Sequence, residues 1–153
     1  KGTGFLNAKK QPMRNHEIVS VFYKKQCIYN PQKTFGHIKK KTFRASHLQT
    51  EVYGEMKNNY HYNSTERYPR SIQIFSTDTQ NSSFHPTQKP ISLFEYLIKT
   101  YTNENDIVLD NCAGSGTTGL ACKNTNRNYI LIEKEEKYFN IIKKRLNPIN
   151  NHD

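Results

Sequence analysis

The stretch "LDNCAGSGTTGLACKN" (residues 109–124) ends a short apolar run, turns through a glycine-rich loop and continues into a short helical segment. Its glycines Gly114, Gly116 and Gly119 have the G-x-G-x-x-G spacing that lets a backbone approach a ligand closely. A strand, a glycine-rich turn and a helix in this order are typical of a doubly wound α/β sheet. The stretch therefore predicts this fold class, with a ligand site at the tip of the strand.

The flanking sequence continues the alternation of helices and strands. We expect a helix that starts at Pro90 in "KPISLFEYLIKTYT", buried parallel strands over 106–110 and 128–133, and helices over 117–123 and 135–146. Two upstream segments, "HEIVSVFYKK" (16–25) and "RSIQIFS" (70–76), have β-branched or alternating composition and predict two further strands. Residues 37–80 are otherwise polar and show no clear helical period.

The residues around the glycine loop narrow the class of ligand. A triphosphate-binding loop needs Lys and Ser or Thr after its second glycine, but Leu120 and Ala121 follow Gly119 here. Glu133 lies 19 residues after Gly114, where an acid holds ribose hydroxyls in dinucleotide sites. Asp110, directly before the loop, suits the ammonium group of S-adenosylmethionine and would repel a pyrophosphate. The pattern favours S-adenosylmethionine over a nicotinamide dinucleotide, which remains the alternative.

The positive charge of the chain is confined to its first third. The net charge is +10 overall, and residues 1–50 contain nine Lys and two Arg against one acid, Glu17. Basic and acidic residues balance in residues 51–153. Such an asymmetry indicates a polyanionic partner, and nucleic acid fits better than a membrane surface because "HIKKKTFRASHL" has no sustained apolar face.

The cysteine content and hydropathy exclude several other classes. The chain has 153 residues, enough for one domain, and a mean hydropathy of -0.90 without an apolar run long enough to span a bilayer. Cys27, Cys112 and Cys122 are widely spaced and form no C-x-x-C pair. We therefore expect no metal site, no disulfide framework and a cytoplasmic location.

Three ordered segments carry a resemblance to a known family. "HPTQKP" (85–90), "VLDNCAGSGTTGLA" (108–121) and "NYILIEKEEKYF" (128–139) resemble signatures of the permuted (beta) class of DNA amino-methyltransferases. That class transfers a methyl group from S-adenosylmethionine to the exocyclic amino group of adenine or cytosine. The resemblance implies a Rossmann-like S-adenosylmethionine-dependent methyltransferase fold with an inserted target-recognition region.

The resemblance also implies roles for individual residues. Cofactor contacts are expected from "TQKP", chiefly Thr87 and Lys89, from Asp110 with the loop, and from Glu133; the loop residues are Ala113, Gly114, Ser115, Gly116, Thr117 and Thr118. In the basic region, we expect Lys39, Lys40, Lys41 and Arg44 to lie near DNA phosphates. Arg67 and Arg70 are the candidates for reading a guanine edge.

The family's catalytic signature, a polar residue followed by Pro-Pro and an aromatic residue, does not occur, because no two prolines of the chain are adjacent. We therefore expect no catalytic residue in this chain, inactivity of the chain alone, and a missing upstream segment supplied in cis or in trans. The implied organisation is the end of a catalytic subdomain (1–36), a target-recognition region (37–80) and a cofactor-binding half (81–150).

Double-stranded DNA is the expected partner, with a homodimer or a restriction partner as further possibilities and no membrane. The alternatives are a non-catalytic DNA-binding half of a split methyltransferase and an RNA methyltransferase.

Overall fold

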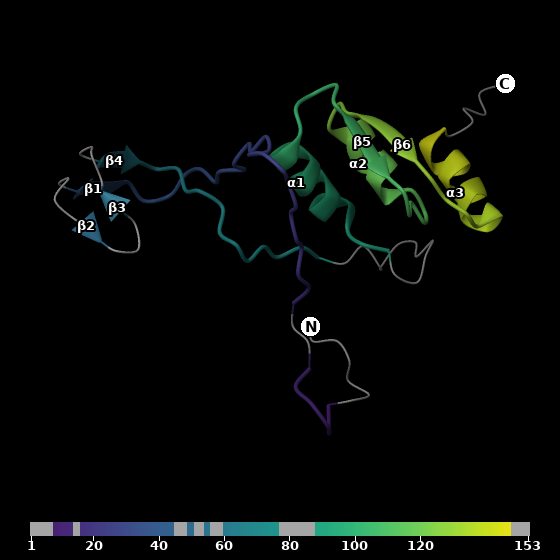
Figure 1. Ribbon diagram of the computed structural model, residues 1–153, viewed down its shortest axis with the longest axis horizontal. Helices are drawn as coiled ribbons and strands as arrows, with labels where there is room; N and C mark the ends of the chain where they lie inside the picture. Colours follow the sequence, from purple (N-terminus) through teal and green to yellow (C-terminus); the bar gives the residue numbers. More distant parts are fainter. Residues whose placement is uncertain are drawn as a thin grey trace.

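The computed structural model describes residues 8–13, 16–44, 49–50, 54–55, 60–76 and 88–147. The elements in chain order are β1 (Lys40–Arg44), β2 (Gln49–Thr50), β3 (Gly54–Glu55), β4 (Tyr60–Ser64), α1 (Ile91–Tyr101), β5 (Ile107–Asp110), α2 (Thr117–Asn124), β6 (Asn128–Leu131) and α3 (Glu136–Leu146). They form two groups joined by extended chain (Figure 1). Strands β1–β4 lie at one end, and α1–α3 with β5 and β6 lie at the other.

The second group is the α/β unit that the sequence predicts. Strands β5 and β6 pair in parallel, with Ile107 opposite Asn128 and Asp110 opposite Leu131. Helix α1 begins directly after Pro90, and all three helices end within two residues of their predicted limits. The predicted order of helix, strand, glycine loop, helix, strand and helix is confirmed.

The core lies between the sheet and the helices. One buried cluster joins α1 to α2 through Ile98, Ala121 and Cys122, and Val108 of β5 packs against it. A second cluster joins the glycine loop to α3; its buried members are Ala113, Ile142 and Leu146. Tyr129 of β6 contacts both clusters, so the helices cover one face of the sheet. Burial also raises the pKa of the Cys122 thiol, which keeps it protonated.

The opposite face of the sheet is exposed, which corrects the expectation of fully buried strands. Ile107 and Leu109 are 66% and 62% exposed, and Ile130 and Ile132 are 52% and 53% exposed. Successive strand residues project to opposite faces, so these four side chains share one face. Within the described part of the chain, helices cover the other face only.

The two upstream strands predicted over 16–25 and 70–76 are wrong. The backbone of both segments lies outside every strand of the described chain, and Phe22 and Ile74 are 91% and 93% exposed. A strand needs a neighbouring strand to receive its hydrogen bonds, and composition alone does not supply one. Residues 70–76 instead run as extended chain between the two groups of elements, and residues 16–25 run as extended chain from the N-terminal side toward α1 (Figure 1).

The polar region contains an antiparallel hairpin that the sequence analysis missed. Strands β1 and β4 pair from Lys40 opposite Ser64 to Arg44 opposite Tyr60. A bridge between Thr34 and Arg67 closes the base of this hairpin, with N···O distances of 3.0 and 2.9 Å. The signal that could have indicated it is the content of aromatic and β-branched residues in "TFR" and "YHY".

Helices α1 and α3, with 11 residues each, are the longest in the described chain, and no helix of that part has the length and apolar character to cross a membrane.

We expect Gly116→Ala to destabilise the α/β unit. Gly116 has a φ of 80°, and an added Cβ would lie 3.1 Å from Cγ1 of Ile142. Left-handed backbone costs a non-glycine residue about 1–2 kcal/mol, to which the contact with Ile142 adds. Urea titration should show this loss. Gly36→Ala is the matched control, since Gly36 has a φ of 75° but nothing within 4 Å of its added Cβ. An equal or larger loss in the control would contradict the packing contribution.

Candidate functional site

The glycine loop leaves the carboxyl end of β5 and leads into α2. Gly114 and Gly116 both have positive φ, at 53° and 80°, a conformation that glycine adopts without strain. The Ala113 N–H donates to the carbonyl of Ile132 at 3.0 Å, which ties the loop to the chain just after β6. The Gly116 N–H donates to the Ala113 carbonyl at 2.8 Å and closes the turn. The sheet and the turn together define the shape of the loop.

Asp110 holds the start of this loop. Its Oδ1 accepts from the Cys112 N–H at 3.0 Å, and its Oδ2 accepts from the hydroxyl of Thr118 in α2. Thr118 is buried, and Asp110 is half-buried. The carboxylate therefore stays at the strand tip, between the loop and the first turn of α2.

Glu133 holds the middle of the same loop. Its Oε2 accepts from the Gly114 N–H at 2.7 Å, and its Oε1 accepts from the Glu135 N–H at 2.9 Å. Glu133 and Gly114, which lie 19 residues apart in the sequence, are therefore in direct contact. Two carboxylates from two neighbouring strand ends thus contact one loop.

Ser115 connects the loop to two residues that the sequence analysis did not select. Arg145 of α3 donates from Nη1 to the Ser115 carbonyl at 3.0 Å, to its Oγ at 3.2 Å and to Oγ1 of Thr117 at 3.4 Å. The Ser115 hydroxyl lies 3.3 Å from Oε1 of Gln88. Arg145 carried no signal beyond that of a basic residue in the last turn of a helix, and Gln88 stood inside a segment already selected.

The remaining predicted cofactor residues lie at the edge of this site or outside the description. Lys89 Nζ forms an ion pair with Oε2 of Glu17 at 2.5 Å, and both side chains are largely exposed. Thr87 lies outside the described residues. Among the described residues of the "TQKP" segment, Gln88 contacts the loop.

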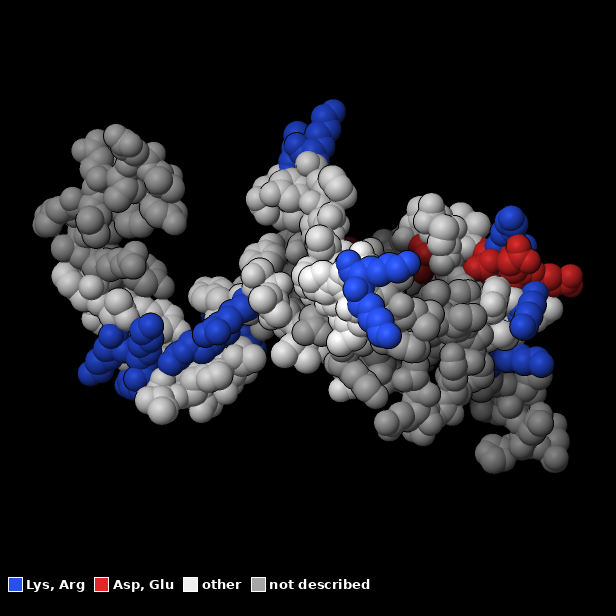
Figure 2. Space-filling model, turned by 90° about the horizontal axis from the view of Figure 1, so that it is seen from below, with Lys and Arg blue, Asp and Glu red and all other residues white. Residues whose placement is uncertain are grey.

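The predicted nucleic-acid residues lie on and beside the hairpin of β1 and β4. Lys39, Lys40 and Lys41 are exposed there, and the side chain of Arg44 lies outside the description. Figure 2 shows Lys and Arg along the hairpin, in the middle of the molecule and at the end that carries α3. The Asp and Glu most visible on this face lie at the α3 end, away from the described residues of the hairpin.

Arg67 and Arg70 differ in their surroundings. Arg67 Nη2 donates to the Ile38 carbonyl at 2.5 Å, and its Nη1 donates to the carbonyls of Glu66 at 2.6 Å and Ser64 at 3.1 Å. This guanidinium holds the base of the hairpin together. Arg70 is exposed. Base contact by either residue stays a prediction, but the donors of Arg67 are directed at the protein's own carbonyls.

Comparison with known proteins gives a family model that matches nearly the whole chain. A family model described as DNA methylase matches residues 1–144. Two Type II methyltransferases match shorter segments. M2.LlaDCHI of Lactococcus lactis subsp. cremoris is 51% identical over 63 residues, which is 41% of this chain and 23% of that protein. M.HinfI of Haemophilus influenzae is 46% identical over 72 residues, which is 47% of this chain and 20% of that protein.

The first of the similar solved structures is a complex of M1.HpyAVI with SAM. It is 35% identical, with 65% of this chain and 56% of that chain covered and a TM-score of 0.41. Among the curated relatives, the matched segment spans about a fifth to a quarter of each protein, from 20% for M.HinfI to 25% for M2.DpnII of Streptococcus pneumoniae.

Proposed function

The chain belongs to the N6 and N4 family of DNA methylases, and from that premise we propose that it forms the cofactor-binding and DNA-recognising part of a methyltransferase. The acceptor in this proposal is the exocyclic amino group of adenine or cytosine in duplex DNA. S-adenosylmethionine supplies, when bound, a methyl group on a sulfonium centre. The residues of this chain hold that donor and position the DNA.

The observation that carries the cofactor assignment is the pair of carboxylates on the glycine loop. Asp110 and Glu133 each accept hydrogen bonds from backbone N–H groups within or next to this loop. An ionised carboxylate can accept several hydrogen bonds at once, so a ligand donor can bind to the same group as a backbone N–H. Two carboxylate acceptors suit a ligand that donates from a cationic group and from a pair of hydroxyls, as S-adenosylmethionine does with its ammonium group and its ribose.

Within this proposal the two acids have separate tasks. Asp110, at the tip of β5, binds the ammonium group at the methionine end, and Glu133, after β6, binds the ribose hydroxyls. The loop from Ala113 to Thr118 encloses the methionine end. Thr87 and Lys89 remain candidates at that same end, where Gln88 already contacts Ser115.

The same site fits poorly with a pyrophosphate. Two carboxylates flank the loop, Asp110 directly before it and Glu133 against the Gly114 N–H. An anionic ligand at that loop would meet like charge, which is unfavourable. The nicotinamide alternative is therefore not favoured.

Duplex DNA is the substrate we assign, because the family model is that of a DNA methylase and the relatives named above are Type II methyltransferases. The RNA alternative has no comparable support. In the proposed organisation, residues 37–80 recognise the target and residues 81–150 bind the cofactor. The proposal assigns no catalytic residue to the chain, which contains no adjacent prolines.

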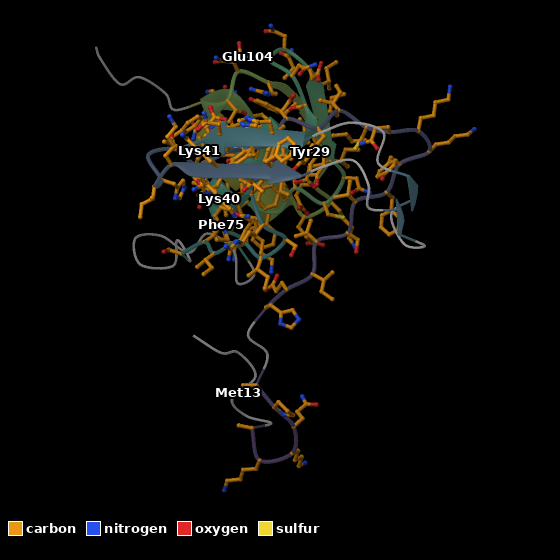
Figure 3. All side chains as sticks on the ribbon, turned by 90° about the vertical axis from the view of Figure 1, so that its left-hand side faces the viewer. Met13, Tyr29, Lys40, Lys41, Phe75 and Glu104 are labelled. Carbon is orange, nitrogen blue, oxygen red and sulfur yellow. The ribbon has the colours of Figure 1, made fainter. Side chains whose placement is uncertain are left out.

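We expect Asp110→Ala and Glu133→Ala each to weaken the binding of S-adenosylmethionine. Loss of a charge-assisted hydrogen bond costs roughly 1–3 kcal/mol, so the dissociation constant should rise about 5- to 150-fold. Isothermal calorimetry with the complete protein measures this change, since the matched segment spans only 20% to 25% of curated relatives such as M.HinfI and M2.DpnII. Glu104→Ala is the matched control, because Glu104 is exposed in the turn before β5 and its removal changes the net charge equally (Figure 3).

Unchanged affinity in both variants would remove the basis for the cofactor assignment. NADH that binds as tightly as S-adenosylmethionine would restore the dinucleotide alternative.

A further inference from the structure

The hairpin of β1 and β4 has two unlike faces. On one face Lys41 lies opposite Asn63 and Phe43 lies opposite His61, and all four side chains are exposed. On the other face Thr42 lies opposite Tyr62, and both are half-buried, as is Ser64. The four exposed residues, Lys41, Phe43, His61 and Asn63, are called the open face below.

The half-buried face is attached to the rest of the chain. The Tyr62 hydroxyl donates to the Glu66 carbonyl and accepts from Nη1 of Arg67 at 3.3 Å. Glu66 forms an ion pair with Lys33 at 2.8 Å, and Lys33 Nζ lies 4.8 Å from the centre of the Tyr68 ring. These contacts hold the hairpin from behind and leave the open face directed outward.

The open face has the chemistry of a base-reading surface. The major groove of B-DNA, about 12 Å wide, admits a two-stranded ribbon. An asparagine side chain can form two hydrogen bonds with the edge of adenine, and an aromatic or apolar side chain can contact the thymine methyl group. Phe43 is 63% exposed, and its ring packs against His61 with the centroids 6.5 Å apart and the planes at 61°. The ring therefore has a defined orientation and a large free surface.

The charge around the open face suits DNA as its occupant. Lys39 precedes β1, and Lys40 and Lys41 are its first two residues (Figure 3). Lysines at the start of the ribbon can contact phosphates while side chains further along reach the bases, which is how most protein–DNA interfaces divide these tasks.

We infer that the open face of the β1–β4 hairpin enters the major groove and reads the target sequence, with Asn63 recognising one base pair and Arg67 positioning the hairpin from behind. This inference rests on the proposed function, because it takes duplex DNA as the substrate. It transfers base reading from Arg67, whose donors are directed at backbone carbonyls, to the residues that project from the opposite face.

The test is selection of bound duplexes from a random DNA library by the chain of 153 residues, followed by sequencing. The wild-type chain should enrich a defined sequence. Asn63→Ala should lose discrimination at one base pair by about 5- to 150-fold, with affinity for unrelated duplexes changed less than about twofold. Asn63→Thr removes the amide and keeps a residue suited to a strand, so it should behave like Asn63→Ala if the hairpin remains folded.

Asn140→Ala is the matched control, because Asn140 is an exposed asparagine on α3, at the other end of the molecule (Figure 1). It should leave the selected sequence unchanged. If both Asn63 variants select the wild-type sequence, the inference is overturned while the proposed function stands. If the wild type binds duplexes without preference, the inference is overturned together with the assignment of target recognition to residues 37–80, while the cofactor assignment stands. If the wild type does not bind duplex DNA at all, the proposed function fails, and the inference fails with it.

Discussion

Simultaneous replacement of Lys39, Lys40 and Lys41 by alanine is expected to flatten the salt dependence of DNA binding. Each phosphate contact contributes about 0.9 to the slope of log affinity against log salt concentration, so three contacts contribute roughly 2.7. The three side chains are exposed at the hairpin, and successive strand residues project to opposite faces, so Lys40 and Lys41 can approach phosphates on two sides. The loss should be similar for all duplex sequences, because phosphate contacts do not distinguish bases.

Fluorescence anisotropy over a salt series measures this slope. Replacement of Lys134, Lys137 and Lys144 is the matched control, since it removes the same charge from exposed positions on and before α3. The control should leave the slope nearly unchanged. An unaltered slope in the variant of Lys39, Lys40 and Lys41 would identify these lysines as solvated surface that does not contact DNA.

Leu146→Ala is expected to destabilise the α/β unit by about 2–5 kcal/mol, the usual cost of truncating a buried leucine. Leu146 is 3% exposed and shares a buried cluster with Ala113 and Ile142. A Cβ added to Gly119 would lie 2.7 Å from Cδ1 of Leu146, so the leucine fills the space left by that glycine. A loss of this size is a large part of the total stability of a small domain, and the midpoint of thermal unfolding should fall clearly.

The matched control is Leu109→Ala. Leu109 is 62% exposed on the uncovered face of the sheet, and its truncation should change the free energy of unfolding by no more than about 0.5 kcal/mol. Equal effects in the two variants would contradict the position of the core on the helical side of the sheet.

The fold of residues 88–147 could be predicted from the sequence because each element has a local signal there. Pro90 marks the start of α1, the apolar runs mark β5 and β6, and the stripe that includes Ile142 and Leu146 marks α3. The segments at 16–25 and 70–76 gave an equally good local signal, but a strand also depends on a partner that local composition does not reveal. The hairpin of β1 and β4 was missed because its polar residues give a weak local strand signal. Its pairing is stabilised by the bridge between Thr34 and Arg67 and by the contacts of Tyr62, which the local sequence does not reveal.

The candidate site also contains residues that the sequence predicts and residues that it does not. Asp110 and Glu133 were predicted from their positions relative to the glycines, and each contacts a backbone N–H within or next to the loop. Arg145 could not be predicted, because its role depends on α3 folding back beneath the loop, 30 residues from Ser115 in the chain. The role of Arg67 could not be predicted from its charge alone. In the sequence, an arginine that hydrogen-bonds backbone carbonyls cannot be distinguished from one that binds guanine.

The contacts of the glycine loop have a further consequence for the thermodynamics of binding. The hydrogen bonds that hold this loop are formed within the protein alone. They join Gly114 to Glu133, Cys112 to Asp110, Ser115 to Arg145 and Gly116 to Ala113. Restricting the backbone of one residue costs about 1–2 kcal/mol of conformational entropy, and for this loop that cost is met when the chain folds. A ligand that enters the loop finds it already ordered, so more of the free energy of its contacts remains as affinity. The rate of ligand binding is then not limited by closure of this loop.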